Sequence, residues 1–207
     1  MKVKIPTLFI IHSALFILLF SGCFNEPEPA YKSVPAESRL YMQDKGLKDL
    51  KSVDLSKVGD YLNLDRNALT NVDEVAALAD LRWLRLNDNR LAALPELSKL
   101  SKLERIYLKN NAFSSVPEQL KDLPKLTDID LSGNPITEVP EWLAKKEGLE
   151  NLSLSRTRLT RLPEDLSAWR SLKSLQLGDL NLSKEEMARI RAAFDPKHNP
   201  LGTAIVF

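Results

Sequence analysis

The chain has 207 residues and a formal net charge of +1, with 29 Lys+Arg against 28 Asp+Glu. This balance gives no support to a nucleic-acid-binding protein, whose domain is expected to be visibly basic. A single cysteine and two histidines exclude an internal disulfide framework and a cysteine-rich zinc site, and they leave little for histidine-based catalysis.

The first 22 residues are expected to form a signal peptide. Lys2 and Lys4 precede an apolar run over residues 7–20, and the small residues Ser21 and Gly22 follow it. A charged start, an apolar stretch and small residues at the cut are typical of secretory signals. The run is shorter than the ~20 residues of a membrane-spanning helix. An uncleaved N-terminal anchor is the alternative.

The lone cysteine lies directly after this segment. Phe20-Ser21-Gly22-Cys23 resembles the lipobox of bacterial lipoproteins, although that family prefers Leu, Val or Ile where Phe20 stands. The resemblance implies that the Cys23 thiol receives a diacylglycerol, that the chain is cut before it, and that acyl chains hold it in the bacterial cell envelope. Phe24, in place of the Asp that often retains such proteins at the inner membrane, favours the outer membrane or the cell surface. A cysteine buried in the apolar stretch is the other interpretation.

Two short segments precede the main body of the chain. Residues 23–36 contain Pro27, Pro29 and Pro35, which disfavour helix and central strand, so this segment is expected to be a semi-rigid tether. Residues 37–58 are interpreted as a degenerate first unit that caps the following solenoid. Its apolar residues are Leu40, Met42, Leu47, Leu50, Val53 and Leu55.

Residues 59–182 consist of one motif repeated six times. Residues 81–91 fit the pattern LxxLxLxxNxL at every fixed place, and the position of its Asn recurs at 67, 89, 111, 134, 157 and 180, in steps of 22 or 23. Thr157 and Leu180 stand at the last two of these positions. A Pro follows a Leu or Val between the copies, in Leu94-Pro95, Val116-Pro117, Val139-Pro140 and Leu162-Pro163. A fixed period of this length predicts a stack of repeats.

The pattern resembles the leucine-rich repeat family in its 22–23-residue form. The resemblance implies an α/β solenoid, a curved right-handed horseshoe with short parallel strands on the concave face and 3₁₀ or irregular pieces on the convex side. The residues agree with this. Leu84 and Leu86 lie on one face of a short strand, and only stacking of neighbouring repeats can bury that face. The repeated Pro tolerates only the first turn of a helix, which excludes long helices at those places.

The Asn of each repeat is expected to satisfy the backbone of the turn after its strand, because an amide both donates and accepts hydrogen bonds. Thr157 can do this only in part and Leu180 not at all, so we expect looser turns late in the ladder. Trp169 is expected in the core of the convex side, whereas the pattern does not place Trp142.

Residues 183–207 are interpreted as the C-terminal cap. Ser183 and Glu186 have the spacing of a capping box at the start of a helix. A final short strand over residues 203–207 is expected to point Ile205 and Phe207 into the core. The helix between them places three apolar residues on one face: Met187, Ile190 and Phe194.

The residues flanking the paired leucines are expected to face outward from the concave side, in lanes that run across the strands. Aromatic and arginine side chains, which dominate binding hot spots, gather in the first three repeats, beside two acids in the fourth. The alternative is that they only solvate an open sheet face. The predicted partner-binding residues are Tyr61, Trp83, Arg105 and Asp128 in the first lane and Arg85, Tyr107 and Asp130 in the second.

We find no constellation that predicts catalysis, a cofactor or a metal site. Asp128 and Asp130 alone do not make a reactive site, His198 has no Ser or Cys partner by pattern, and the common catalytic motifs are absent from the sequence. The sequence therefore predicts a non-catalytic interaction module, a lipoprotein that binds a protein partner on its concave face and no nucleic acid. The alternatives are a structural envelope lipoprotein without a specific ligand, or a hydrolytic enzyme.

Overall fold

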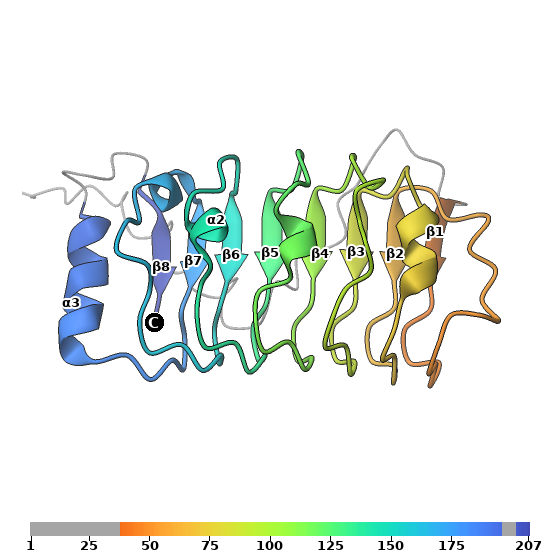
Figure 1. Ribbon diagram of the computed structural model, residues 1–207, viewed down its shortest axis with the longest axis horizontal. Helices are drawn as coiled ribbons and strands as arrows, with labels where there is room; N and C mark the ends of the chain where they lie inside the picture. The colour runs from red at the N-terminus through yellow and green to blue at the C-terminus, as the bar shows by residue number, and fades with distance from the viewer. Residues whose placement is uncertain (1–37, 196–201) are drawn as a thin grey trace, which may run out of the picture. The chain divides into compact units, whose positions relative to one another are not determined.

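A single parallel sheet organises the chain, with one short strand from each repeat. The computed structural model describes residues 38–195 and 202–207. Within them, eight strands pair side by side in sequence order (Figure 1). They are β1 (Arg39–Tyr41), β2 (Tyr61–Asn63), β3 (Trp83–Arg85), β4 (Arg105–Tyr107), β5 (Asp128–Asp130), β6 (Asn151–Ser153), β7 (Ser174–Gln176) and β8 (Ala204–Val206).

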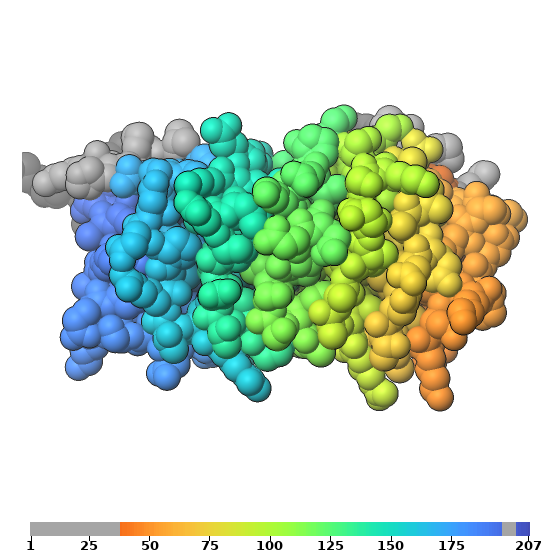
Figure 2. All heavy atoms as spheres, viewed as in Figure 1, coloured from red at the N-terminus to blue at the C-terminus, as the bar shows by residue number. Residues whose placement is uncertain are grey.

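The strand register repeats the sequence register. Leu62, Leu84 and Ile106 are directly paired across β2, β3 and β4, and the same match continues through the later strands. The repeat leucines on either side of these positions are buried and form one continuous apolar core. Successive coils of the chain form bands in sequence order on the face seen in Figure 2. Each coil therefore buries its apolar face against its neighbours, as a repeat solenoid requires.

The side opposite the strands carries only short helical pieces, which lie in front of the sheet in Figure 1. They are η2 (Asp73–Ala77), η3 (Glu118–Leu120), α2 (Glu141–Ala144) and η4 (Ala168–Ser171), and η3 and α2 begin directly after a Pro. Trp169 is fully buried here and donates its indole N–H to the Leu143 carbonyl at 3.0 Å, which confirms its predicted place in the core. Trp142 packs partly buried against the same core, and its indole N–H donates to Glu118 at 2.9 Å.

The four asparagines of the ladder bond as predicted. The Asn89 amide nitrogen donates to the Leu64 and Leu86 carbonyls at 3.0 and 3.1 Å, and its oxygen accepts from the Leu69 N–H at 3.0 Å. Asn67, Asn111 and Asn134 make the corresponding bonds in their own coils. Each amide therefore joins its own turn to the preceding coil.

The late turns lose these bonds but keep their backbone shape. Thr157 makes one such bond, from its hydroxyl to the Leu154 carbonyl at 2.8 Å, and Leu180 packs against the core instead. Arg156 and Asp179 nevertheless adopt φ of 54° and 58°, close to the 56° of Asp88 in an asparagine-bearing turn. The expected loosening is thus a loss of side-chain hydrogen bonds, without a change in the conformation of these residues.

The two ends are closed differently. At the N-terminal end, β1 pairs fully with β2, and Leu50 is buried beneath the first coil. At the other end, Ser183 accepts a hydrogen bond from the Glu186 N–H at 3.1 Å at the start of α3 (Lys184–Ala193). The Glu186 carboxylate does not close the capping box, because it accepts from the Leu162 N–H and pairs with Arg189.

The prediction for Phe207 was wrong. Ile205 packs against the core, but Phe207 is 38% exposed and lies under the guanidinium of Arg191, 4.9 Å from the ring centroid. The predicted signal peptide, the tether with Cys23, and His198 lie outside the described residues. In the part that is described, none of the helices has the length and apolar character needed to cross a membrane.

Candidate functional site

The structure brings the predicted binding residues together on the strands, away from the short helical pieces. Tyr61, Trp83, Arg105 and Asp128 are paired in turn across β2 to β5 and form the first lane. Arg85, Tyr107 and Asp130 are paired across β3 to β5 in the second lane. Neighbouring strands of a sheet lie about 4.8 Å apart, so these side chains form one compact patch.

Aromatic rings run through this patch without a break. The Tyr61 ring lies 5.2 Å from that of Tyr41 and 5.3 Å from that of Trp83, the latter edge to face. The Trp83 and Tyr107 rings are 5.9 Å apart. These separations are those of favourable aromatic pairs, each worth about 0.5–1.5 kcal/mol beyond the area buried.

Two arginines lie over the rings. The Arg105 guanidinium is 4.9 Å from the Trp83 ring centroid, and the Arg85 guanidinium is 5.3 Å from that of Tyr107. Both distances are within the range of a cation–π contact. The arginines and aromatics of the two lanes therefore hold one another in place.

The expectation that these side chains face solvent was wrong for most of them. In the full chain Tyr61, Trp83 and Tyr107 are only 4%, 5% and 1% exposed, and Asp128 and Asp130 are also buried. The repeat pattern identifies the face of the sheet correctly, but it does not describe how side chains on that face pack together.

Neighbouring groups of the protein donate hydrogen bonds to both acids of β5. Asp128 accepts hydrogen bonds from the Thr127 hydroxyl at 2.6 Å and the Asn151 amide at 2.8 Å. Asp130 accepts from the Ser132 hydroxyl and N–H at 2.6 and 2.9 Å. Burial raises the pKa of Asp130 above its usual value, against the opposing effect of the Ser132 hydrogen bonds.

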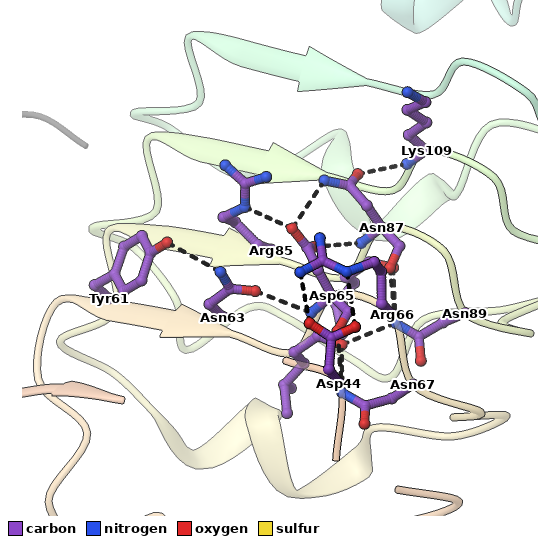
Figure 3. Close-up of polar contacts among 12 residues, drawn as sticks. Asp44, Tyr61, Asn63, Asp65, Arg66, Asn67, Arg85, Asn87, Asn89 and Lys109 are labelled. Carbon is purple, nitrogen blue, oxygen red and sulfur yellow. Dashed lines mark hydrogen bonds and ion pairs between the residues drawn. The ribbon is translucent and has the colours of Figure 1, made fainter. Parts of the chain in front are cut away.

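A third acid, Asp65, was not predicted as part of the site. Its carboxylate accepts from Arg85 Nε at 2.8 Å and from the Asn87 N–H at 2.8 Å, and Figure 3 shows it among these partners. Burial, the largest single effect, would lower the pKa of Arg85, but the charge and hydrogen bond of Asp65, with smaller effects of Tyr61 and Tyr107, together outweigh it and leave that pKa raised. The signal was present in the sequence, because Asp65 lies one coil before Arg85 in a third lane. This lane is formed by the residues two positions after the end of each strand, Asp65, Asn87, Lys109, Ser132, Ser155 and Gly178.

The cations reach the surface farther than the acids do. The Arg105 side chain is 25% exposed, whereas that of its neighbour Asp128, 4.0 Å away, is 4% exposed. Lys109, in the third lane beyond β4, is half-buried. On β6 and β7, by contrast, the described lane residues carry no charge. They are Asn151, Ser153, Ser155, Ser174, Gln176 and Gly178.

The patch consists of aromatic rings, guanidinium groups and hydrogen-bonded carboxylates. Within residues 38–195 and 202–207, no group of three His, Cys, Asp or Glu side chains is placed to hold a metal ion. The Trp83 indole N–H is buried and has no hydrogen-bond acceptor among the described residues. Such a donor is unusual, since most buried polar groups are paired.

One strand per coil, an uninterrupted parallel register and an asparagine ladder through the first four turns define a repeat solenoid. The family model described as "Leucine rich repeat" matches residues 95–136, and the motif runs well beyond that stretch on both sides. The chain therefore has the fold of a leucine-rich repeat solenoid.

A solved structure with the same fold is an internalin from Listeria monocytogenes str. 4b F2365. It matches with a TM-score of 0.58 and 20% sequence identity, over 66% of this chain and 39% of that chain. The match therefore spans well under half of the internalin, and at this identity the likeness is one of fold. No curated protein matches the chain.

Proposed function

We propose that the protein is a non-catalytic interaction module that binds a protein partner on the strand-bearing face of its solenoid. The observation that carries this proposal is the compact patch of Tyr61, Trp83, Arg85, Arg105 and Tyr107 on β2 to β4. Tyr, Trp and Arg are the residue types enriched in binding hot spots. The patch is held rigidly by ring stacking and ion pairs, which lowers the entropy lost when a partner binds.

Site-specific photo-crosslinking tests this proposal. A photoreactive phenylalanine in place of Tyr41, which is 40% exposed beside the patch, is expected to capture a discrete partner protein from a cell-envelope extract. The same residue in place of Trp142, on the opposite side, is the matched control. Equal capture from both positions, or capture from the Trp142 position alone, contradicts binding on the strand-bearing face.

We further propose that the protein is displayed as a lipoprotein on the bacterial cell envelope. This rests on the sequence, where Ser21-Gly22-Cys23 follows a charged start and an apolar run. A diacylglycerol on Cys23 and a tether over residues 23–36 hold the repeats at a membrane surface, and Phe24 favours the outer membrane.

Mass spectrometry of the mature N-terminus checks the anchor. The expected result is a chain that begins at an acylated Cys23 and that fractionates with membranes. Cys23→Ser is expected to stop maturation or to release the protein. An unmodified terminus elsewhere than residue 23 would exclude lipidation at this position, and it would leave the binding proposal untouched.

A further inference from the structure

The charges on the binding face are arranged with the acids inside and the cations outside. Asp65, Asp128 and Asp130 are buried, and groups of the fold donate hydrogen bonds to each of them. The side chains of Arg85 and Arg105 are 14% and 25% exposed. A partner that approaches β3 and β4 therefore meets positive charge first, although the three acids equal in number the three cations Arg85, Arg105 and Lys109.

The cations also have a defined spacing. Arg105 and Lys109 lie four residues apart on the line of β4, with Tyr107 between them on the same face. At a rise of about 3.3 Å per residue, their Cα atoms are about 13 Å apart. Arg85 lies beside Tyr107 on the neighbouring strand. An extended chain with carboxylates at its own residues i and i+4 has the same spacing.

The indole N–H of Trp83 is independent evidence that a hydrogen-bond acceptor of a partner binds at this face. Its side chain is 95% buried, yet its indole N–H has no acceptor among the described residues. The other two tryptophans of the chain both donate, Trp142 to Glu118 and Trp169 to the Leu143 carbonyl. Arg105 lies over the Trp83 ring, so a carboxylate drawn to Arg105 arrives beside the one indole donor that lacks a partner.

We propose that this face binds an acidic, extended segment of a partner protein, with two carboxylates four residues apart engaged by Arg105 and Lys109. The inference rests on the proposed function and names the chemistry of the partner. Separated carboxylates suit the patch better than a densely charged polyanion, because buried Asp65 and Asp128 lie 2.8 and 4.0 Å from the two arginines and would repel dense negative charge.

Selection from a random peptide library on the immobilised full chain tests the proposal. The expected result is enrichment of peptides that carry Asp or Glu at positions i and i+4. Raising the ionic strength is expected to weaken their binding, because the cations are partly exposed to solvent. Enrichment of basic or uncharged peptides overturns the proposal, as does a selection that enriches none. Equally tight binding of heparin or polyphosphate also overturns it, because the face would then recognise polyanions in general.

Variants locate the contact. Arg105→Gln and Lys109→Gln are each expected to weaken binding of a selected peptide about five- to tenfold. Arg158→Gln is the matched control, because Arg158 is exposed in the turn region after β6 and outside the lanes. Lys109→Gln leaves the cation–π contact of Arg105 intact, so it reports on binding even if Arg105→Gln lowers stability. Equal effects of all three substitutions contradict the assigned site.

Nuclear magnetic resonance of the indole N–H groups gives a second measurement. Addition of a selected peptide is expected to shift the Trp83 signal, while those of Trp142 and Trp169 stay in place. No shift at Trp83 on binding contradicts the proposed location. If acidic peptides fail but crosslinking at position 41 captures a partner, the acidic preference is wrong and the binding function stands. If both fail, the binding function itself is wrong.

Discussion

The side-chain amide of Asn111 reaches back 25 residues to the Leu86 carbonyl of the preceding coil, at 2.9 Å. The same amide donates to the Leu108 carbonyl of its own strand at 3.0 Å, and its oxygen accepts from the Leu91 N–H at 3.0 Å. One largely buried side chain thus satisfies backbone groups from two coils.

Asn111→Leu is therefore expected to lower the free energy of unfolding by about 2–4 kcal/mol, because several buried backbone groups lose their partners. Chemical denaturation measures this change. Thr157→Val is the control for scale, since Thr157 makes one such bond and its loss is expected to cost about 1 kcal/mol. An unfolding midpoint of Asn111→Leu equal to that of the wild type would show that the ladder adds no stability.

Trp83→Ala is expected to destabilise the fold by about 2–4 kcal/mol, because the buried ring packs against Tyr61 and Tyr107 and under Arg105. Thermal unfolding measures the change. Gln176→Ala, at a half-buried site of the second lane, is expected to stay within about 0.5 kcal/mol of the wild type. A Trp83→Ala protein as stable as the wild type would mean that the ring serves binding alone.

Asp130→Asn is expected to stabilise the protein at neutral pH. Burial raises the pKa of Asp130 in the folded state, so the folded state binds more protons than the unfolded state between the two pKa values. Wild-type stability attributable to this group therefore falls as the pH rises from the unfolded pKa, about 3.9, through the folded one. The asparagine oxygen still accepts the Ser132 bonds and carries no charge.

Unfolding midpoints as a function of pH check this prediction. The two proteins are expected to be equally stable well below pH 4 and to diverge as the pH rises, with Asp130→Asn the more stable. Parallel curves, or a variant that is less stable at neutral pH, would show that the ionised carboxylate is favoured at this site.

Gly133→Ala is expected to destabilise the fold by about 2 kcal/mol. Gly133 has φ of 70°, where an alanine is strained by about 1 kcal/mol, and its Cβ would lie 2.1 Å from the Asn110 side-chain oxygen. Asn110 must then move and lose its 2.6 Å bond to Asp88. Gly148→Ala is the matched control, because φ is 78° there and a Cβ meets nothing within 4 Å. Equal losses of stability would show that Asn110 yields without penalty.

The period of the sequence was sufficient to predict the strands, their parallel order and the ladder. The asparagine spacing alone indicates that Asn89 and Asn111 occupy equivalent turns, and the structure gives them equivalent partners. The predicted lanes are likewise those of the observed register.

Burial on the lanes could not be predicted in the same way. A period specifies which face a residue occupies, but it does not specify the contacts of Trp83 with Tyr61, Arg105 and Tyr107 or its low exposure. The contact of Phe207 with Arg191 is likewise a side-chain packing detail that the period does not specify. Asp65 pairs with Arg85 of a different lane. Comparing residues within one lane at a time does not predict such a contact.

The asparagine ladder also makes the two ends of the solenoid different. Asn89, Asn111 and Asn134 each fasten the coil that precedes them, and Thr157 bonds within its own coil. Within the described coils, the last asparagine of the ladder therefore acts on the coil of Leu108. The coils after it are joined by packing, strand pairing and isolated side-chain bonds such as that of Trp169 to the Leu143 carbonyl. Thermal fluctuations are thus expected to open the stack from its C-terminal end, so that backbone amides of β6 and β7 exchange with solvent deuterium sooner than those of β3 and β4. The patch of Trp83 and Tyr107 lies in the half that opens last, and it can keep its shape while the far end of the protein frays and closes again.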